Sequence, residues 1–104
     1  MWRVLFTEKC ELEIRKSLKE RRLSDDDLRI IGSWIRTIQM NGPEALPKQK
    51  IWNDHALEGE WEGCRSSAYS PSGRIIYKVD DGRIIVIVVR ITPNHDYRGR
   101  NEKD

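Results

Sequence analysis

The sequence predicts an α+β fold in which one antiparallel sheet of about four strands packs on two N-terminal helices, in the order β-α-α-β-β-β. Apolar residues recur at three- and four-residue spacing in the first half of the 104-residue chain, which is typical of amphipathic helices. The second half alternates in period two and carries an Asp-Gly pair between two β-branched runs, which indicates a hairpin. We expect residues 1–104 to form one domain.

Composition and charge limit the possible functions. The chain is 38% hydrophobic and 35% charged, as in globular proteins, with a net charge of only +2. Affinity for a polyanion therefore depends on where the basic side chains lie. The sequence lacks an 18-residue apolar run and a signal-peptide pattern, so we expect a cytoplasmic protein without a membrane partner. Cys10 and Cys64 have no metal-ligand spacing, so we expect buried thiols and neither a metal nor another cofactor.

The elements of the first half follow from caps and spacing. Residues 2–6 predict a strand, and Thr7 followed by Glu8 predicts a helix start. The first helix should run to about residue 22 with a buried stripe of Cys10, Ile14 and Leu18. Ser24 and the three aspartates after it predict a second helix, because the hydroxyl caps free amides and the carboxylates oppose the dipole. Its predicted buried stripe is Leu28, Ile31, Ile35 and Ile38, and residues 41–43 end it.

The second half predicts a loop followed by three strands. Residues 42–54 contain two prolines and no clear period, so we expect a surface loop, and residues 60–68 predict a strand. A two-residue turn at residues 81 and 82 would pair Lys78 with Ile85 and Arg74 with Val89. One face of this hairpin should then pack on the helices and the other remain open to a partner. The packed face is predicted to carry Ile75, Tyr77, Val79, Ile84, Val86 and Val88, and the open face Arg74, Ile76 and Lys78.

A motif spans residues 54–97: Leu-x-Gly-x-Trp, an arginine on the following strand, an Ile-Tyr-Lys-Val strand, an acidic turn, and a histidine beyond the last strand. In these features the segment resembles the C-terminal half of the RelE/ParE superfamily of bacterial type II toxins, especially the YafQ and YoeB branches. The first half shares only the strand-helix-helix order of that superfamily. The matching residues are Leu57, Gly59, Trp61, Arg65, Arg74, Tyr77, Asp80, Asp81, Gly82 and His95.

The resemblance implies the toxin of a type II toxin-antitoxin system, a ribosome-dependent mRNA endoribonuclease. Its expected partners are a cognate antitoxin protein, the ribosome and mRNA. The implied chemistry needs no metal: a base activates a ribose 2′-hydroxyl, which attacks the adjacent 3′-phosphate. Cations stabilise the phosphorane, and an acid protonates the leaving 5′-oxygen.

The same resemblance suggests catalytic residues. His95 and His55 are the expected proton-transfer groups, because histidine titrates near neutral pH. Arg74 and Arg65 are the expected phosphate-binding cations, because a guanidinium presents a rigid fork to two phosphate oxygens. An ion pair of Arg65 with a nearby glutamate is a competing structural use. Tyr97 is expected to stack on a base, to assist proton transfer or to cover the sheet edge.

Further basic and aromatic residues are candidate RNA contacts. Trp52 lies in the predicted loop beside Lys48 and Lys50, where an exposed indole could stack on a base. The full set of expected RNA-binding residues is Lys48, Lys50, Trp52, Lys78 and Arg98. Residues 98–104 are expected to form a flexible tail.

The sequence also departs from the toxin pattern and leaves alternatives open. Residues 48–51 offer no counterpart of the YoeB-like carboxylate upstream of Leu57, and Ala68 and Ser72 stand where YafQ-like sequences have a histidine and an acid. A ParE-like toxin, which binds and inhibits DNA gyrase without being a nuclease, has the same fold and needs no proton-transfer pair. A plain protein-interaction module is a third alternative.

Overall fold

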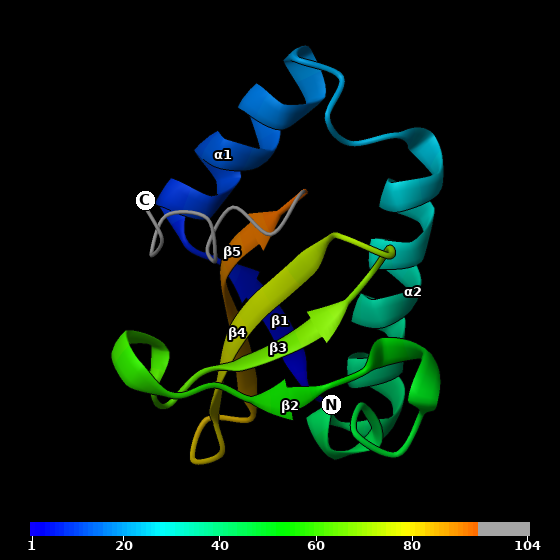
Figure 1. The fold of residues 1–104 in the computed structure, drawn as a ribbon. Helices are drawn as coiled ribbons and strands as arrows, with labels where there is room; N and C mark the ends of the chain where they lie inside the picture. Colours follow the sequence, from blue (N-terminus) through cyan, green and yellow to red (C-terminus); the bar gives the residue numbers. More distant parts are fainter. Residues whose placement is uncertain (94–104) are drawn as a thin grey trace.

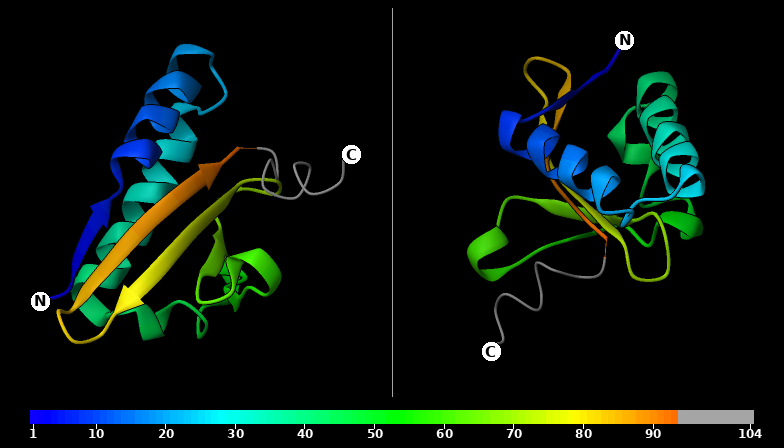
Figure 2. Two further views of the ribbon diagram at one scale, coloured as in Figure 1. Left: turned by 90° about the vertical axis from the view of Figure 1, so that its left-hand side faces the viewer. Right: turned by 90° about the horizontal axis from the view of Figure 1, so that it is seen from above.

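A computed structural model of the chain describes residues 1–93. It contains two helices, α1 (Glu8–Lys19) and α2 (Asp25–Asn41), and three single 3-10 turns, η1 (Pro43–Ala45), η2 (Lys50–Trp52) and η3 (Gly59–Trp61). The strands are β1 (Arg3–Phe6), β2 (His55–Ala56), β3 (Arg65–Ala68), β4 (Arg74–Asp80) and β5 (Ile85–Thr92). Both helices cover one face of a sheet with strand order β1-β5-β4-β3-β2 (Figures 1 and 2). The predicted α+β class is confirmed.

The sheet is mixed, because β1 pairs with β5 in parallel while the remaining strands pair antiparallel. The wholly antiparallel sheet predicted from the sequence is therefore wrong at this edge. The two helices separate β1 from the other strands along the chain, so no hairpin turn fixes its direction. Within the described residues, no helix is long and apolar enough to cross a membrane.

Both predicted helix starts are confirmed. The Thr7 hydroxyl accepts a hydrogen bond from the Cys10 amide, and Ser24 and Asp27 form a reciprocal capping box with two 3.0 Å bonds. The helix α1 ends at Lys19 rather than near residue 22. Leu18 and Leu28, predicted to be buried, are 41% and 38% exposed, while Ser17 and Trp34 take buried positions. The 3.6-residue turn rotates each helix so that these neighbouring positions meet the sheet.

The predicted two-residue hairpin turn is wrong. Residues 81–84 form the connection, Asp80 pairs with Ile85, and Lys78 pairs with Ile87. The Asp80 carboxylate holds this loop by accepting bonds from the Arg83 backbone amide and guanidinium. Ile84 has a positive φ of 56° and is 43% exposed, so it lies outside the predicted packed face.

From Tyr77 to Asp80 this register error is two residues, so the β4 side chains stay on their predicted faces. Ile75, Tyr77 and Val79 pack with the helices as expected, together with Val86 and Val88. We call the opposite side of the sheet the outer face, and by alternation it carries Arg74, Ile76 and Lys78. A register shift between Ile76 and Tyr77 then brings Arg90 opposite Ile76 and Thr92 opposite Arg74.

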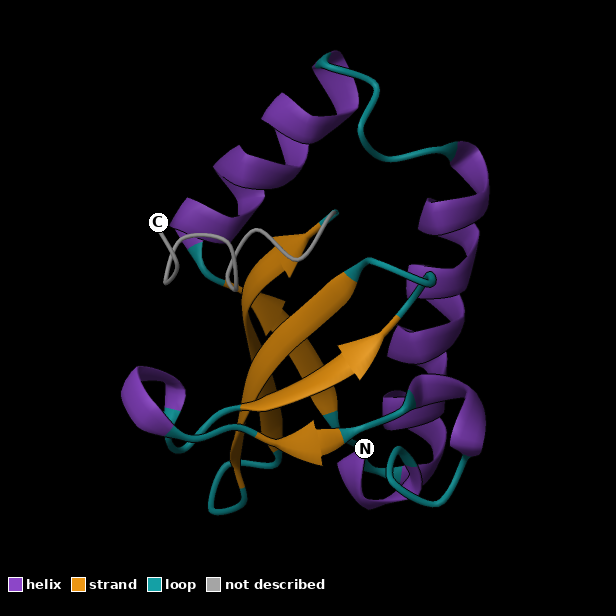
Figure 3. Ribbon diagram, in the orientation of Figure 1, coloured by secondary structure: helices purple, strands orange, loops and turns teal. Residues whose placement is uncertain are grey.

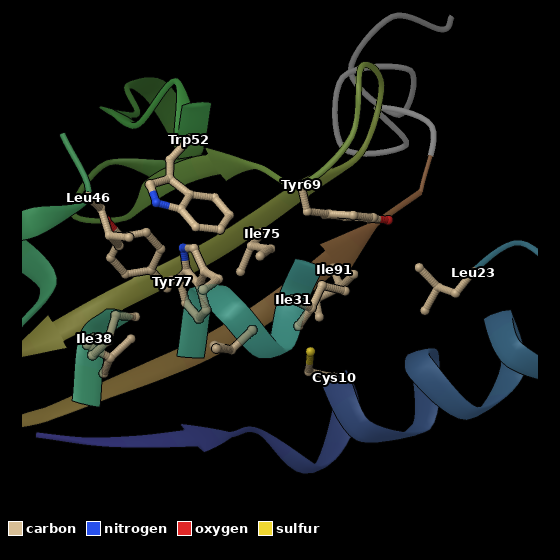
Figure 4. Packing of buried hydrophobic residues seen from close by; sticks show 13 residues of the cluster. Cys10, Leu23, Ile31, Ile38, Leu46, Trp52, Tyr69, Ile75, Tyr77 and Ile91 are labelled. Carbon is tan, nitrogen blue, oxygen red and sulfur yellow. The ribbon is translucent and has the colours of Figure 1, made fainter. Parts of the chain in front are cut away.

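The segment before β3 is more ordered than predicted (Figure 3). The expected surface loop of residues 42–54 forms η1 and η2 and buries Leu46 and Trp52 in the core (Figure 4). The strand predicted for residues 60–68 is shorter, because η3 and Gly63, with a φ of +93°, precede its start at Arg65. Cys10 and Cys64 are buried free thiols, as expected.

Candidate active site

The sheet register aligns residues from four strands in one row that begins at the predicted candidate His55. The Cα partners run from His55 to Ser66, from Ser66 to Ile76, and from Ile76 to Arg90. A second row links Ala68, Arg74 and Thr92. Because neighbouring strands lie about 4.8 Å apart and alternate residues about 6.6 Å apart, the Cα atoms of His55 and Arg74 lie roughly 12 Å from each other. Both side chains can therefore reach one phosphodiester group.

His55 is exposed on the short strand β2, and its ring has a defined partner. The Nδ1 atom lies 3.1 Å from the Asn53 carbonyl oxygen. Since a carbonyl can only accept a hydrogen bond, Nδ1 carries the proton in the neutral ring. Nε2 is then the free basic nitrogen, which is what a general base needs.

Arg74 lines a pocket of about 380 Å³ at the edge of β3, together with Asn53, whose carbonyl orients His55, and Ala68, its cross-strand partner. The rest of the lining includes Trp52, Tyr69 and Ile30. The Arg74 Nη1 atom is buried and has no hydrogen-bond partner among residues 1–93. A buried cationic donor without an acceptor is suited to receive a phosphate oxygen.

Arg90, at the other end of the row, was missed by the sequence reasoning. Its Nε lies 3.5 Å from Oε1 of Glu13 on α1, so the two side chains form an ion pair but no hydrogen bond. The hydroxyls of Ser66 and Thr92, in the same two rows, are also buried without partners among the described residues. The sequence did contain a signal for this residue, because Arg90 interrupts the apolar run of β5. A cation in such a strand needs a partner or a ligand.

Arg65, in contrast, lies on the helix-facing side of the sheet, opposite Tyr77. Its guanidinium binds Asp54 through Nε at 2.8 Å and Nη2 at 2.7 Å, and not Glu60 or Glu62. Burial is the largest single influence and lowers the pKa of Arg65, but the hydrogen bond and charge of Asp54, together with Tyr77, outweigh it and the pKa is raised. The structure therefore does not bring Arg65 together with His55 and Arg74 on the outer face.

Asp54, which the sequence reasoning did not consider, has no exposed side-chain surface. Besides Arg65, it accepts hydrogen bonds from the Ser67 hydroxyl at 2.6 Å and from the Tyr77 hydroxyl at 2.5 Å. Burial, followed by the bond to Asp54, raises the pKa of Tyr77. With both oxygens occupied and buried, Asp54 is not available as a general base, so it does not replace the YoeB-like carboxylate.

The predicted RNA contacts are scattered. Lys48 lines a pocket of about 480 Å³ with Arg65, Tyr77 and Val79, on the helix-facing side. Lys50 and Lys78 are exposed, at η2 and on the outer face respectively. The prediction for Trp52 is wrong: its indole is 3% exposed and donates a 2.8 Å hydrogen bond to Gln49.

Three predicted residues, His95, Tyr97 and Arg98, lie outside the described residues, as does the expected tail at residues 98–104. The described part of β5 ends at Thr92, beside Arg74, so the chain leaves the sheet next to the two rows. Residues 1–93 contain no cluster of three or more histidine, cysteine, aspartate or glutamate side chains that could hold a metal ion.

Comparisons with known proteins concern the fold of the chain. No protein-family model matches the chain. Over 48 residues, 46% of this chain and 50% of the other, it is 33% identical to the mRNA interferase toxin YafQ of Escherichia coli K12. The match thus spans half the length of that relative.

Two solved structures cover more of the chain. The crystal structure of YafQ from E. coli BL21(DE3) superposes with a TM-score of 0.69 and 18% identity, over 94% of this chain and 98% of YafQ. The heterotetrameric YoeB-YefM toxin-antitoxin complex from Staphylococcus aureus contains a chain with a TM-score of 0.65 and 15% identity, over 88% and 95%. The chain therefore has the fold of the YafQ and YoeB toxins, as the sequence motif predicted.

Proposed function

We propose that this protein is the toxin of a type II toxin-antitoxin system and acts as a ribosome-dependent mRNA endoribonuclease. The observation that carries the proposal is the outer face of the sheet, where β2, β3 and β4 bring His55 and Arg74 within reach of one phosphodiester. The 48-residue similarity to an mRNA interferase toxin supports it. We propose that the protein acts in the cytoplasm, because its proposed substrate is mRNA bound to the ribosome.

The proposed reaction is an internal displacement at phosphorus. A histidine removes the proton of the ribose 2′-hydroxyl, and the 2′-oxygen attacks the adjacent phosphorus. The bond from phosphorus to the 5′-oxygen breaks, and a second histidine protonates that oxygen. The products are a 2′,3′-cyclic phosphate and a free 5′-hydroxyl.

The side chains have matching roles in this proposal. With its Nδ1 proton directed to the Asn53 carbonyl, His55 offers Nε2 for one proton transfer, and His95 is proposed for the other. The buried Nη1 of Arg74 would bind a phosphate oxygen whose negative charge grows in the transition state. Arg90 lies in the same row and adds a second cation. Proton transfer and charge stabilisation are thus both assigned to side chains, so the proposed mechanism uses no metal.

The proposed partners are the ribosome, mRNA and a cognate antitoxin. Support for the antitoxin comes from proteins of the same fold, since the S. aureus structure is a YoeB-YefM toxin-antitoxin complex. A protein that cleaves mRNA must be held inactive in the cell that makes it. We therefore expect co-expression with the product of a neighbouring reading frame to restore growth.

The function is tested by inducing the protein in cells and mapping new mRNA 5′ ends. We expect cleavage at defined positions relative to codons, and its loss in Arg74→Ala, His55→Ala and His95→Ala. Arg83→Ala is the matched control, because Arg83 pairs with Asp80 in the exposed hairpin loop, away from both rows. Growth arrest with damaged DNA and intact mRNA would contradict the proposal and favour gyrase inhibition. Intact mRNA and normal growth would favour an interaction module.

A further inference from the structure

The chain reverses direction sharply just before His55. Asn53 adopts a left-handed conformation with φ 45° and ψ 48°, which asparagine tolerates better than most residues. From there Asp54 and His55 enter β2, where consecutive side chains point to opposite sides of the sheet. Asp54 points to the helix-facing side and bonds Arg65, Ser67 and Tyr77, while His55 occupies the row on the outer face.

Backbone pairing anchors β2, the strand that holds His55, only weakly. This strand has two residues, paired only with Ser66 and Arg65. It lies at the sheet edge, so no strand among residues 1–93 supports it from the other side. The flanking backbone bond, from the Leu57 amide to the Cys64 carbonyl at 3.0 Å, adds one contact. The position of His55 therefore depends on something other than strand pairing.

The Asp54 side chain supplies that anchor. Its donors come from β3 and β4, and Ser67 also accepts a 3.0 Å bond from the Trp34 indole of α2. Trp34 in turn packs edge-on against Tyr77, with ring centroids 5.3 Å apart. Because the carboxylate is buried, each of these partners offsets part of the cost of its burial, and losing one weakens the anchor.

We infer that Asp54 is a positioning residue. Its side chain is bonded to the core, and because Asp54 directly precedes His55, this fixes the ring of His55 on the outer face. This inference rests on the proposed function for its catalytic consequence, but not for its structural one. Asp54 itself touches no substrate, since its side chain has no exposed surface.

The test compares the wild type with Asp54→Asn, which keeps the shape but removes the charge that balances Arg65. Tyr77→Phe is a milder variant, because it removes one donor and leaves Ser67 and Arg65. Asp80→Asn is the matched control, since Asp80 pairs with Arg83 in the hairpin loop. Ile38→Val lowers stability in the α2 core at an apolar side chain that makes none of the hydrogen bonds to Asp54. It therefore reports the effect of destabilisation alone.

Two readouts separate positioning from stability. NMR should show changed chemical shifts for the His55 ring in Asp54→Asn, and hydrogen exchange at the Leu57 amide should accelerate about tenfold or more relative to Ile38→Val. Cleavage of ribosome-bound mRNA should fall in kcat by about 10- to 100-fold with KM nearly unchanged, because misplacement of a reacting group costs turnover. Tyr77→Phe should fall between wild type and Asp54→Asn.

The outcomes distinguish this inference from the proposed function. Unchanged His55 signals and Leu57 exchange in Asp54→Asn would overturn the inference, whatever happens to cleavage. If the His55 signals and the Leu57 exchange change in Asp54→Asn but His55→Ala cleaves mRNA normally, the structural role of Asp54 is kept and the catalytic role of His55 is refuted. Equal changes in Ile38→Val would also overturn the inference, because they would show that general destabilisation is sufficient.

Discussion

Replacing Arg74 by methionine should change stability and activity in opposite directions. The Arg74 guanidinium has a buried Nη1 without a partner among the described residues, in a pocket lined by Trp52, Ile30 and Tyr69. An unsatisfied buried donor costs about 1 to 3 kcal/mol. Methionine has a similar length and no donor, so Arg74→Met should leave the free energy of unfolding unchanged or raise it by about 1 kcal/mol.

The same substitution should nearly abolish cleavage. Removing one donor that stabilises charge in a transition state typically lowers kcat by about 100- to 1,000-fold, or roughly 3 to 4 kcal/mol. Arg74→Lys keeps the positive charge but loses the paired donors of the guanidinium, so kcat should fall less, by about tenfold. Urea denaturation gives the free energies of unfolding, and single-turnover cleavage of ribosome-bound mRNA gives the rates. A loss of more than about 1 kcal/mol in Arg74→Met would refute the reasoning, since it would show that the guanidinium supports the fold.

Two predictions concern the core. Trp52→Ala should lower the free energy of unfolding by about 3 to 5 kcal/mol, because the indole is buried; Trp52→Phe should leave RNA affinity unchanged, and weaker binding by a stable Trp52→Phe would restore the predicted RNA contact. Burial, followed by Glu13, raises the pKa of the Cys10 thiol to about 12. The unfolded chain ionises this thiol first, near pH 8.5 to 9, so its contribution to stability is complete below that pH and declines as the pH rises toward 12. In urea titrations at pH 8 and pH 10 the wild type should lose roughly 1 to 2 kcal/mol more than Cys10→Ala, and equal losses would contradict the burial.

Local signals in the sequence were sufficient where the cause of the structure is local. The caps at Thr7 and Ser24 depend on residues three positions away, so both helix starts were predicted correctly. The faces of β4 and β5 were also predicted, because they depend only on alternation. The hairpin register was not, since the Asp80 carboxylate stabilises a four-residue connection where Asp-Gly favoured a shorter one.

Long-range contacts explain the remaining differences. Trp52 looked exposed beside two lysines, but it lies in the core cluster with residues from distant elements, including Ile31 and Tyr77. Asp54 looked like a loop residue, yet its partners are 11 to 23 positions further along the chain. Neither contact has a periodic signature, so single-sequence patterns do not reveal it.

The contrast between Arg65 and Arg74 shows how alternation sorts similar residues into different roles. Both arginines matched the toxin motif, and both lie on strands of the same hairpin, but at positions of opposite parity. Arg65 faces the helices and meets a buried carboxylate, so its charge is already neutralised by Asp54. Arg74 has no such partner in residues 1–93 and keeps its charge for a ligand. A guanidinium without a counter-ion destabilises the fold unless an anion binds it, and we therefore expect phosphate-bearing substrate to stabilise the wild type but not Arg74→Met.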